Sequence, residues 1–115
     1  MKKVSKELAI GRFSIPYRAY GESGKVVVCV NGSQQTMSSW RSFVSAFVDE
    51  FTVVVFDFPA HGRAKTLSGP PPINIDEQIE VLLGVVKATN CHRINLACAS
   101  WGSLLGVLLS AWRIC

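Results

Sequence analysis

The chain alternates between hydrophobic runs and short polar breaks, and three of those runs are typical of buried strands. Residues 25–30, 51–58 and 93–99 are rich in valine, isoleucine, leucine, alanine or phenylalanine. Continuous hydrophobicity is expected of strands that are covered on both faces, as in a parallel sheet. Residues 13–20 alternate loosely, and the turn residues 21–24 connect this expected strand to the first buried one.

Segments with helical periodicity lie between these strands. Residues 40–48 place hydrophobic side chains at i, i+3, i+4, i+7 and i+8, and Ser38 or Ser39 is the expected N-cap. A second helix is expected to begin at Asn74, where Glu77 is placed to complete a capping box. The glycine- and proline-rich segment before Asn74 is expected to be a loop.

The order of these elements predicts an α/β fold in three layers. A further helix, from residue 102 to about residue 112, follows the last strand, so strands and helices alternate along the chain. The three buried strands are therefore expected to be adjacent and parallel, with right-handed crossovers. Ligands bind beyond the carboxyl ends of the strands in such sheets. Residues 31–36, 57–65 and 100–103 are the polar breaks at those ends, so candidate chemistry lies there.

Length, composition and charge limit the classes of protein. A chain of 115 residues with 49% hydrophobic content is one globular unit. The net charge is +4, and a solvated basic N-terminal end is favoured over a nucleic-acid surface, because its basic residues form no dense block. Those residues are Lys2, Lys3, Lys6, Arg12 and Arg18. No signal-peptide pattern and no run of roughly 18 apolar residues is present, so a cytoplasmic protein without a transmembrane segment is expected.

Cofactor and metal sites are not expected. The four cysteines lie in apolar surroundings, which is typical of buried free thiols in a reducing compartment. They are Cys29, Cys91, Cys98 and Cys115. Cys91 and His92 are adjacent, which is poor spacing for a shared zinc ion. No Gly-Lys-Ser/Thr follows a strand as in a P-loop, and Gly102 and Gly106 lack the spacing of a dinucleotide site.

The stretch Cys98-Ala99-Ser100-Trp101-Gly102 places a lone serine between the third buried strand and its helix. A serine at such a tight turn is held in a strained backbone conformation with its hydroxyl above the sheet, and the turn needs small residues two positions away on either side. Cys98 stands where the usual G-x-S-x-G pattern has its first glycine. Taken alone, the pentapeptide fits a nucleophile and a structural turn serine about equally well.

Acyl transfer also requires an oxyanion hole. One backbone N–H comes from the residue after the nucleophile and another from an earlier strand-to-helix loop. Trp101 would supply the first and Ser33 the second, because Asn31-Gly32 lets the backbone fold close to the serine. An ordinary tight turn is the alternative for Asn31-Gly32, but the amphipathic helix that follows argues against a hairpin.

With these motifs in this order, residues 17–112 resemble the N-terminal half of the α/β-hydrolase superfamily. The stretches "VNG" and "SWG" look most like the 3-hydroxyacyl acyltransferase group. That group includes the synthase of the rhamnolipid lipid chain and the 3-hydroxyacyl-ACP:CoA transacylase of polyhydroxyalkanoate synthesis. The resemblance implies a mostly parallel sheet and an acyl-ACP or acyl-CoA substrate. It also implies Ser100 as nucleophile, Ser33 and Trp101 at the oxyanion hole, and Asn31, Gly32 and Gly102 as supporting turn residues.

The sequence departs from the superfamily in one respect. The superfamily's triad runs in the order Ser, Asp or Glu, His, and neither an acid nor a histidine follows Ser100. His61 and Asp57 lie where the superfamily usually has structural residues, and His92 is expected at the surface.

Residues 1–115 are therefore expected to be a single partial domain, truncated after the helix that follows Ser100 and inactive alone. The full-length parent is expected to be a serine-nucleophile acyltransferase or hydrolase of (3-hydroxy)acyl thioesters or esters. An exposed sheet edge would favour self-association. The alternative is a non-catalytic binding or scaffold domain in which Ser100 is only a turn residue.

Overall fold

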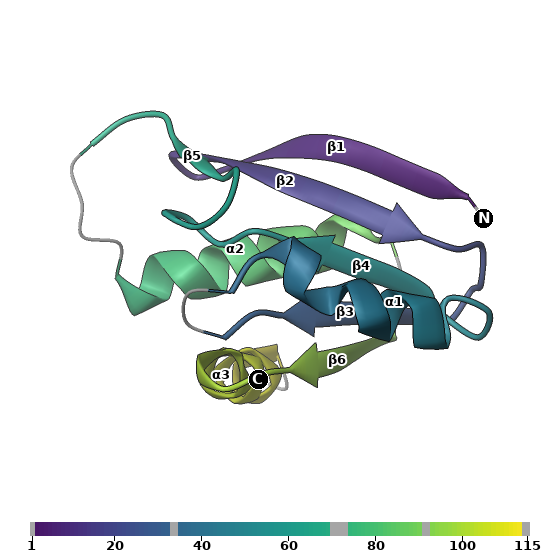
Figure 1. The fold of residues 1–115 in the computed structure, drawn as a ribbon. Helices are drawn as coiled ribbons and strands as arrows, with labels where there is room; N and C mark the ends of the chain where they lie inside the picture. The colour runs from purple at the N-terminus through teal and green to yellow at the C-terminus, as the bar shows by residue number, and fades with distance from the viewer. Residues whose placement is uncertain (1, 33–34, 70–73, 91–92, 114–115) are drawn as a thin grey trace.

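A computed structural model describes residues 2–32, 35–69, 74–90 and 93–113 of the protein. Figure 1 shows strands and helices alternating along the chain after an N-terminal hairpin. The strands are β1 (Lys3–Ile10), β2 (Phe13–Tyr20), β3 (Val26–Val30), β4 (Thr52–Phe56), β5 (Lys65–Thr66) and β6 (Ile94–Cys98). The helices are η1, a 3₁₀ turn (Met37–Trp40), α1 (Arg41–Phe47), α2 (Ile75–Ala88) and α3 (Trp101–Arg113).

The strands form one sheet in the order β1-β2-β4-β3-β6, with the short β5 beside β2. β3 pairs in parallel with both β4 and β6, so that Val28 lies opposite Val54 on one side and Leu96 on the other. This confirms the prediction that the three buried strands are adjacent and parallel. The sheet as a whole is mixed rather than mostly parallel, because β2 pairs antiparallel with β1, β4 and β5.

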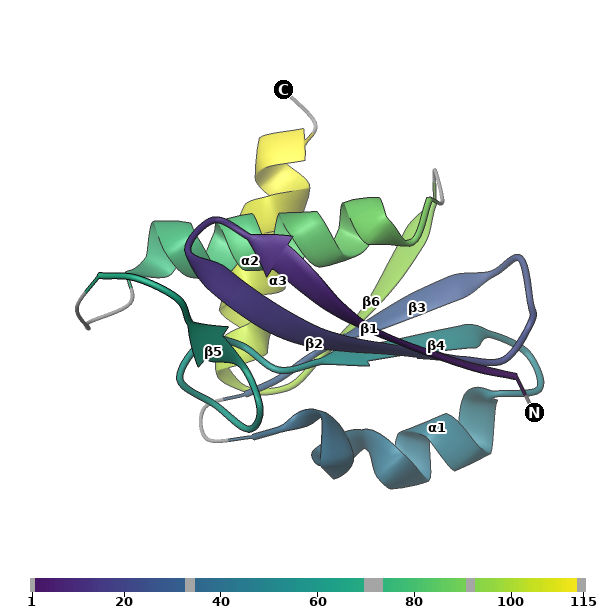
Figure 2. The same cartoon turned by 90° about the horizontal axis from the view of Figure 1, so that it is seen from above.

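Helices cover both faces of the sheet, which confirms the three-layer arrangement. Figure 2 shows α1 on one face and α2 with α3 on the other. Successive residues of β3 face opposite sides, as the period of two in a strand requires. Val28 and Val30 belong to the core beneath α2 and α3, whereas Val27 and Cys29 belong to the core beneath α1.

The N-cap of α2 is the residue that the sequence predicts, whereas the N-cap before α1 is a different residue. The Asn74 side chain accepts a hydrogen bond from the Glu77 N–H at 2.8 Å, and Glu77 accepts one from the Asn74 N–H, which confirms the capping box. Before α1, however, the chain begins to turn at Met37 with Thr36 as N-cap, not at Ser38 or Ser39. The turn starts early because the Met37 N–H donates to the buried carboxylate of Asp57 at 2.7 Å.

The sequence analysis expected Arg12 to be a solvated charge, but the structure shows it in an ion pair. It lies in the turn between β1 and β2, and its guanidinium forms an ion pair with Glu77 (Nε to Oε2, 2.7 Å). A second hydrogen bond joins Arg12 Nη2 to Glu77 Oε1 at 3.2 Å. These hydrogen bonds hold the pKa of Glu77 below its ordinary value and raise the pKa of Arg12. The pair ties the N-terminal hairpin to the first turn of α2.

The two described cysteines differ in exposure. Cys29 is fully buried in the centre of the sheet, and burial raises the pKa of its thiol to about 12. Cys98 is exposed at the end of β6, so the expectation of a buried thiol is wrong for this residue. The reason is that, within the described part of the chain, β6 pairs with β3 alone and forms an edge of the sheet. Cys91, His92 and Cys115 lie outside the described residues.

Among the helices of the described residues, none has both the length and the hydrophobicity to cross a membrane.

Candidate functional site

Ser100 lies in the tight turn between β6 and α3, beyond the carboxyl end of the sheet. Its φ angle is +49°, a left-handed conformation that residues other than glycine adopt at a cost in energy. Two hydrogen bonds close the turn around it, from the Gly102 N–H to the Ala99 carbonyl at 2.8 Å and from the Ser103 N–H to the Ser100 carbonyl at 3.0 Å. Ser100 is an exposed residue.

Gly102 lets the start of α3 lie directly on the end of β3. A Cβ atom at this position would overlap the carbonyl oxygens of Val30 and Asn31 and lie 2.9 Å from the Val30 carbonyl carbon. The Ala99 N–H also donates to the Val30 carbonyl at 3.1 Å. The predicted role of Gly102 as a supporting small residue therefore has a physical reason, which is close approach of two backbones.

Gly32 brings the loop after β3 against the turn that holds Ser100. A Cβ atom at Gly32 would lie 3.0 Å from both the Ala99 carbonyl oxygen and the Ser100 Cβ. The Gly32 N–H donates to Gln35 Oε1 at 2.6 Å, which folds the loop back on itself. The structure thus brings Gly32 and Ser100 together, while Ser33 lies outside the described residues.

Asn31 is buried beneath this contact, and both polar ends of its side chain are hydrogen-bonded. Its Nδ2 donates to the Phe56 carbonyl at 2.9 Å, and its Oδ1 accepts from the Trp40 indole at 2.6 Å. Asn31 therefore fixes the end of β3 to the end of β4 and to η1. The sequence analysis named Asn31 but missed Trp40, although a buried asparagine at a strand end requires such partners.

Asp57 organises the loop after β4 in the same way. It is buried, and its Oδ1 and Oδ2 accept hydrogen bonds from the backbone N–H groups of Met37 and Arg63, at 2.7 and 3.0 Å. Gly62, with a φ of +51°, packs so closely on this carboxylate that a Cβ atom would overlap it. Both oxygens of Asp57 thus serve the backbone, as expected of a structural residue.

A pocket of about 260 Å³ lies beside the Ser100 turn and is lined from all three strand ends. Its lining residues are Gly32, Phe58, Pro59, His61, Gln78 and Trp101. The Trp101 indole donates to Gln78 Oε1 at 2.8 Å and covers one side of the pocket. Its backbone N–H belongs to the first turn of α3, where N–H groups have no partner within the helix. Sequence reasoning named Gly32 and Trp101 here and missed Phe58 and Gln78.

Within the described part of the chain, the single histidine is His61. Its Nδ1 lies 3.0 Å from the carbonyl oxygen of Pro59, in the same loop. This contact is local, as the sequence analysis expected of His61. A serine hydroxyl without a positioned base is a weak nucleophile near neutral pH.

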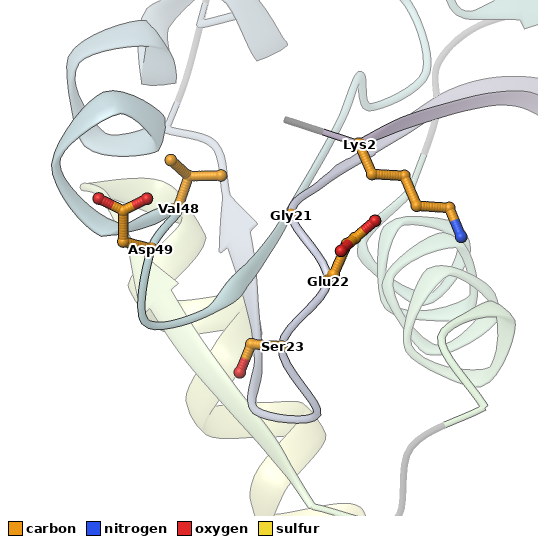
Figure 3. A pocket seen from close by; sticks show the side chains of 6 residues that line it. All are labelled: Lys2, Gly21, Glu22, Ser23, Val48 and Asp49. Carbon is orange, nitrogen blue, oxygen red and sulfur yellow. The ribbon is translucent and has the colours of Figure 1, made fainter.

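A second hollow lies at the opposite end of the sheet, next to the turn that leads into β3. Figure 3 shows the residues that line it, which are Lys2, Gly21, Glu22, Ser23, Val48 and Asp49. Its volume is about 540 Å³. It holds side chains of both charges and none of the predicted site residues. Of the predicted site residues, Gly32 and Trp101 line the pocket beside Ser100.

Comparison with known proteins agrees with this architecture. A family model described as alpha/beta hydrolase fold matches residues 25–111. Among curated protein sequences, none matches this chain.

Solved structures of hydrolases are similar to the chain throughout its length. Epoxide hydrolase I from potato (Solanum tuberosum) has a TM-score of 0.85 at 18% identity and matches 97% of this chain. An alpha/beta hydrolase from Sphaerobacter thermophilus has a TM-score of 0.82 at 23% identity and matches 93% of this chain. At these identities the likeness concerns the fold alone. The chain spans 36% of the potato enzyme and 40% of the Sphaerobacter protein.

Proposed function

The chain belongs to the alpha/beta hydrolase fold family, and from this premise we propose that Ser100 is the nucleophile of an acyl-transferring or acyl-hydrolysing enzyme. The observation that carries the proposal is the Ser100 turn itself. An exposed serine at φ +49° lies beyond the carboxyl end of the sheet and beside a pocket. The strained turn is typical of a nucleophile elbow.

The oxyanion hole is proposed from Trp101 and Ser33. The N–H of Trp101 follows the nucleophile at the start of α3, and Gly32 touches the Ser100 turn one residue before Ser33. Gly102 lets α3 approach the end of β3, and the hydrogen bonds of the Asn31 side chain fix that strand end to β4 and η1. Two fixed N–H donors would stabilise the negative charge that forms on the acyl oxygen.

In the proposed reaction, the Ser100 oxygen attacks the acyl carbonyl carbon as its hydroxyl proton passes to a base. The carrier thiol or alcohol leaves with a proton, and the acyl group then passes from the serine to an acceptor hydroxyl or to water. Residues 101–115 contain no histidine and no acid. We therefore propose that residues 1–115 alone turn over at most slowly, with only oxyanion stabilisation and binding to assist the serine.

The substrates proposed are (3-hydroxy)acyl thioesters or esters, carried as acyl-ACP or acyl-CoA in the cytoplasm. Support for acyl transfer comes from the resemblance of the "VNG" and "SWG" stretches, whereas the similar solved structures are named as hydrolases. A non-catalytic scaffold is the second candidate, because no acid or histidine follows Ser100 in these residues.

A fluorophosphonate probe tests the proposal, applied to residues 1–115 and to the full reading frame that contains them. We expect strong labelling of the full-frame protein and trace labelling of residues 1–115. Ser100→Ala should abolish labelling, whereas Ser103→Ala, an exposed serine in the first turn of α3, should leave it intact. Equal labelling of Ser100→Ala and wild type, or a stop codon directly after Cys115, would favour the scaffold.

A further inference from the structure

A basic groove lies on the α1 face of the sheet, between β2 and the helices η1 and α1. Two adjoining hollows of about 210 and 220 Å³ form it, and both are lined by Arg18 and Met37. Arg41 lines the first hollow and Arg63 the second. We call this surface the arginine groove. It exists because α1 covers β3 and β4 and leaves the β1–β2 hairpin uncovered on this side (Figure 1).

The three guanidinium groups of the arginine groove are not neutralised by carboxylates. Within the described part of the chain, the ion pair found is that of Arg12 with Glu77, on another part of the surface. One acid, Glu7, and one further cation, Lys6, line the second hollow, and the Glu7 carboxylate accepts a hydrogen bond from the Ser14 hydroxyl at 3.0 Å. The groove therefore carries a net positive charge, with the hydroxyls of Ser38 and Ser45 beside it.

The walls of the groove are held by the buried carboxylate of Asp57. Its two oxygens accept hydrogen bonds from the backbone N–H groups of Met37 and Arg63, two residues that line the groove. The residue after Asp57, Phe58, lines the pocket beside Ser100. Asp57 and Phe58 therefore link the groove and the Ser100 pocket to the same strand end, that of β4.

From this arrangement we propose that the arginine groove binds the phosphate of the phosphopantetheine arm that carries the acyl donor. The proposal rests on the function proposed above, since both acyl-ACP and acyl-CoA carry this arm. Guanidinium groups bind phosphate through paired, charge-assisted hydrogen bonds, and serine hydroxyls add further donors. The acyl thioester lies at the far end of the arm, so a phosphate held by Arg18 and Arg41 leaves the thioester free to reach Ser100.

Isothermal titration calorimetry with phosphopantetheine and with pantetheine tests the proposal, because the two probes differ only in the phosphate. We expect phosphopantetheine to bind at least about tenfold more tightly, as a hydrogen-bonded charge pair typically contributes that factor. Arg18→Gln and Arg41→Gln should each reduce this preference about tenfold, and raising the salt concentration should weaken it. Lys25→Gln is the matched control, because Lys25 is an exposed cation at the amino end of β3 and its loss should leave affinity unchanged.

Equal affinity for the two probes, or an equal loss in Lys25→Gln, would overturn the groove proposal. Titrations of CoA and of holo-ACP identify the source of the arm, since the true donor should bind more tightly and lose affinity in Arg18→Gln. Ser100→Ala should bind phosphopantetheine like wild type. The two proposals can therefore be tested separately. Fluorophosphonate labelling tests the role of Ser100, and the preference for phosphopantetheine over pantetheine tests the role of the arginines.

Discussion

Gly102→Ala is the substitution that most sharply tests how Ser100 is held. An added Cβ at this position has no free space, because the carbonyl oxygens of Val30 and Asn31 already occupy it. These oxygens belong to the backbone of β3 and of the turn after it, which cannot swing aside as a flexible side chain would. The start of α3, and with it the Ser100 turn, must therefore move away from β3.

The expected cost follows from two opposing effects. Overpacking typically destabilises by about 1–3 kcal/mol, and contact with two backbone carbonyls places this case near about 3 kcal/mol. Alanine favours a helix over glycine by about 1 kcal/mol, which offsets part of this cost. The net loss in the free energy of unfolding is about 2 kcal/mol. For a domain of this length, that corresponds to a fall in Tm of about 8 °C.

Urea and thermal unfolding followed by circular dichroism measure this loss. Gly24→Ala is the control, because nothing lies within 4 Å of a Cβ at Gly24, and its stability should change by less than about 0.5 kcal/mol. The shift of the turn should also lower fluorophosphonate labelling of Ser100 in the full-frame protein. A Gly102→Ala protein as stable as Gly24→Ala would refute the close packing of α3 on β3.

Three further predictions concern other parts of the molecule. Iodoacetamide should alkylate Cys98 in the folded protein because this residue is exposed, even though partial burial raises the pKa of its thiol. It should reach Cys29, which is buried and whose pKa is raised to about 12, only after unfolding, and peptide mapping by mass spectrometry distinguishes the two. Glu77→Gln keeps the capping box but loses the ion pair with Arg12, so it should lower Tm at neutral pH. Because the folded state lowers the pKa of Glu77, that stabilisation is present above the ordinary value of 4.5 and is lost as pH falls through the folded pKa, so the two melting curves should converge in acid. If the β6 edge and α3 promote self-association, Val107→Lys, at a position 66% exposed, should reduce the larger species seen by light scattering for residues 1–115.

The interior of the sheet could be predicted from the sequence because burial on both faces leaves a strong signal. The β-branched runs of β3 and β4 and the apolar run of β6 each mark a strand, and their alternation with helices implies parallel pairing. β1 gives no such signal, since the polar run Ser5-Lys6-Glu7 interrupts any alternation of polar and apolar residues in this edge strand. Its place in the sheet depends on pairing with β2, which only the folded chain shows.

The candidate site was predictable where a turn imposes a residue type and not where partners come from distant elements. Ser100 and Gly102 follow from the strand-to-helix turn, and Gly32 from the loop opposite. Gln78 in α2 reaches the pocket through its hydrogen bond to the Trp101 indole, which depends on how α2 packs beside α3. Arg12 was expected in solvent for the same reason, as its partner lies far along the chain.

The most direct measurement of the central claim is to trap the acyl-enzyme and locate the acyl group. The full-frame protein is mixed with a 3-hydroxyacyl thioester, quenched in acid and digested, and tandem mass spectrometry of the peptide containing residues 100–103 distinguishes Ser100 from Ser103. The account predicts an acyl adduct on Ser100 that is absent from Ser100→Ala and present in Ser103→Ala. An adduct on another residue, or turnover of the thioester that persists in Ser100→Ala, would contradict it.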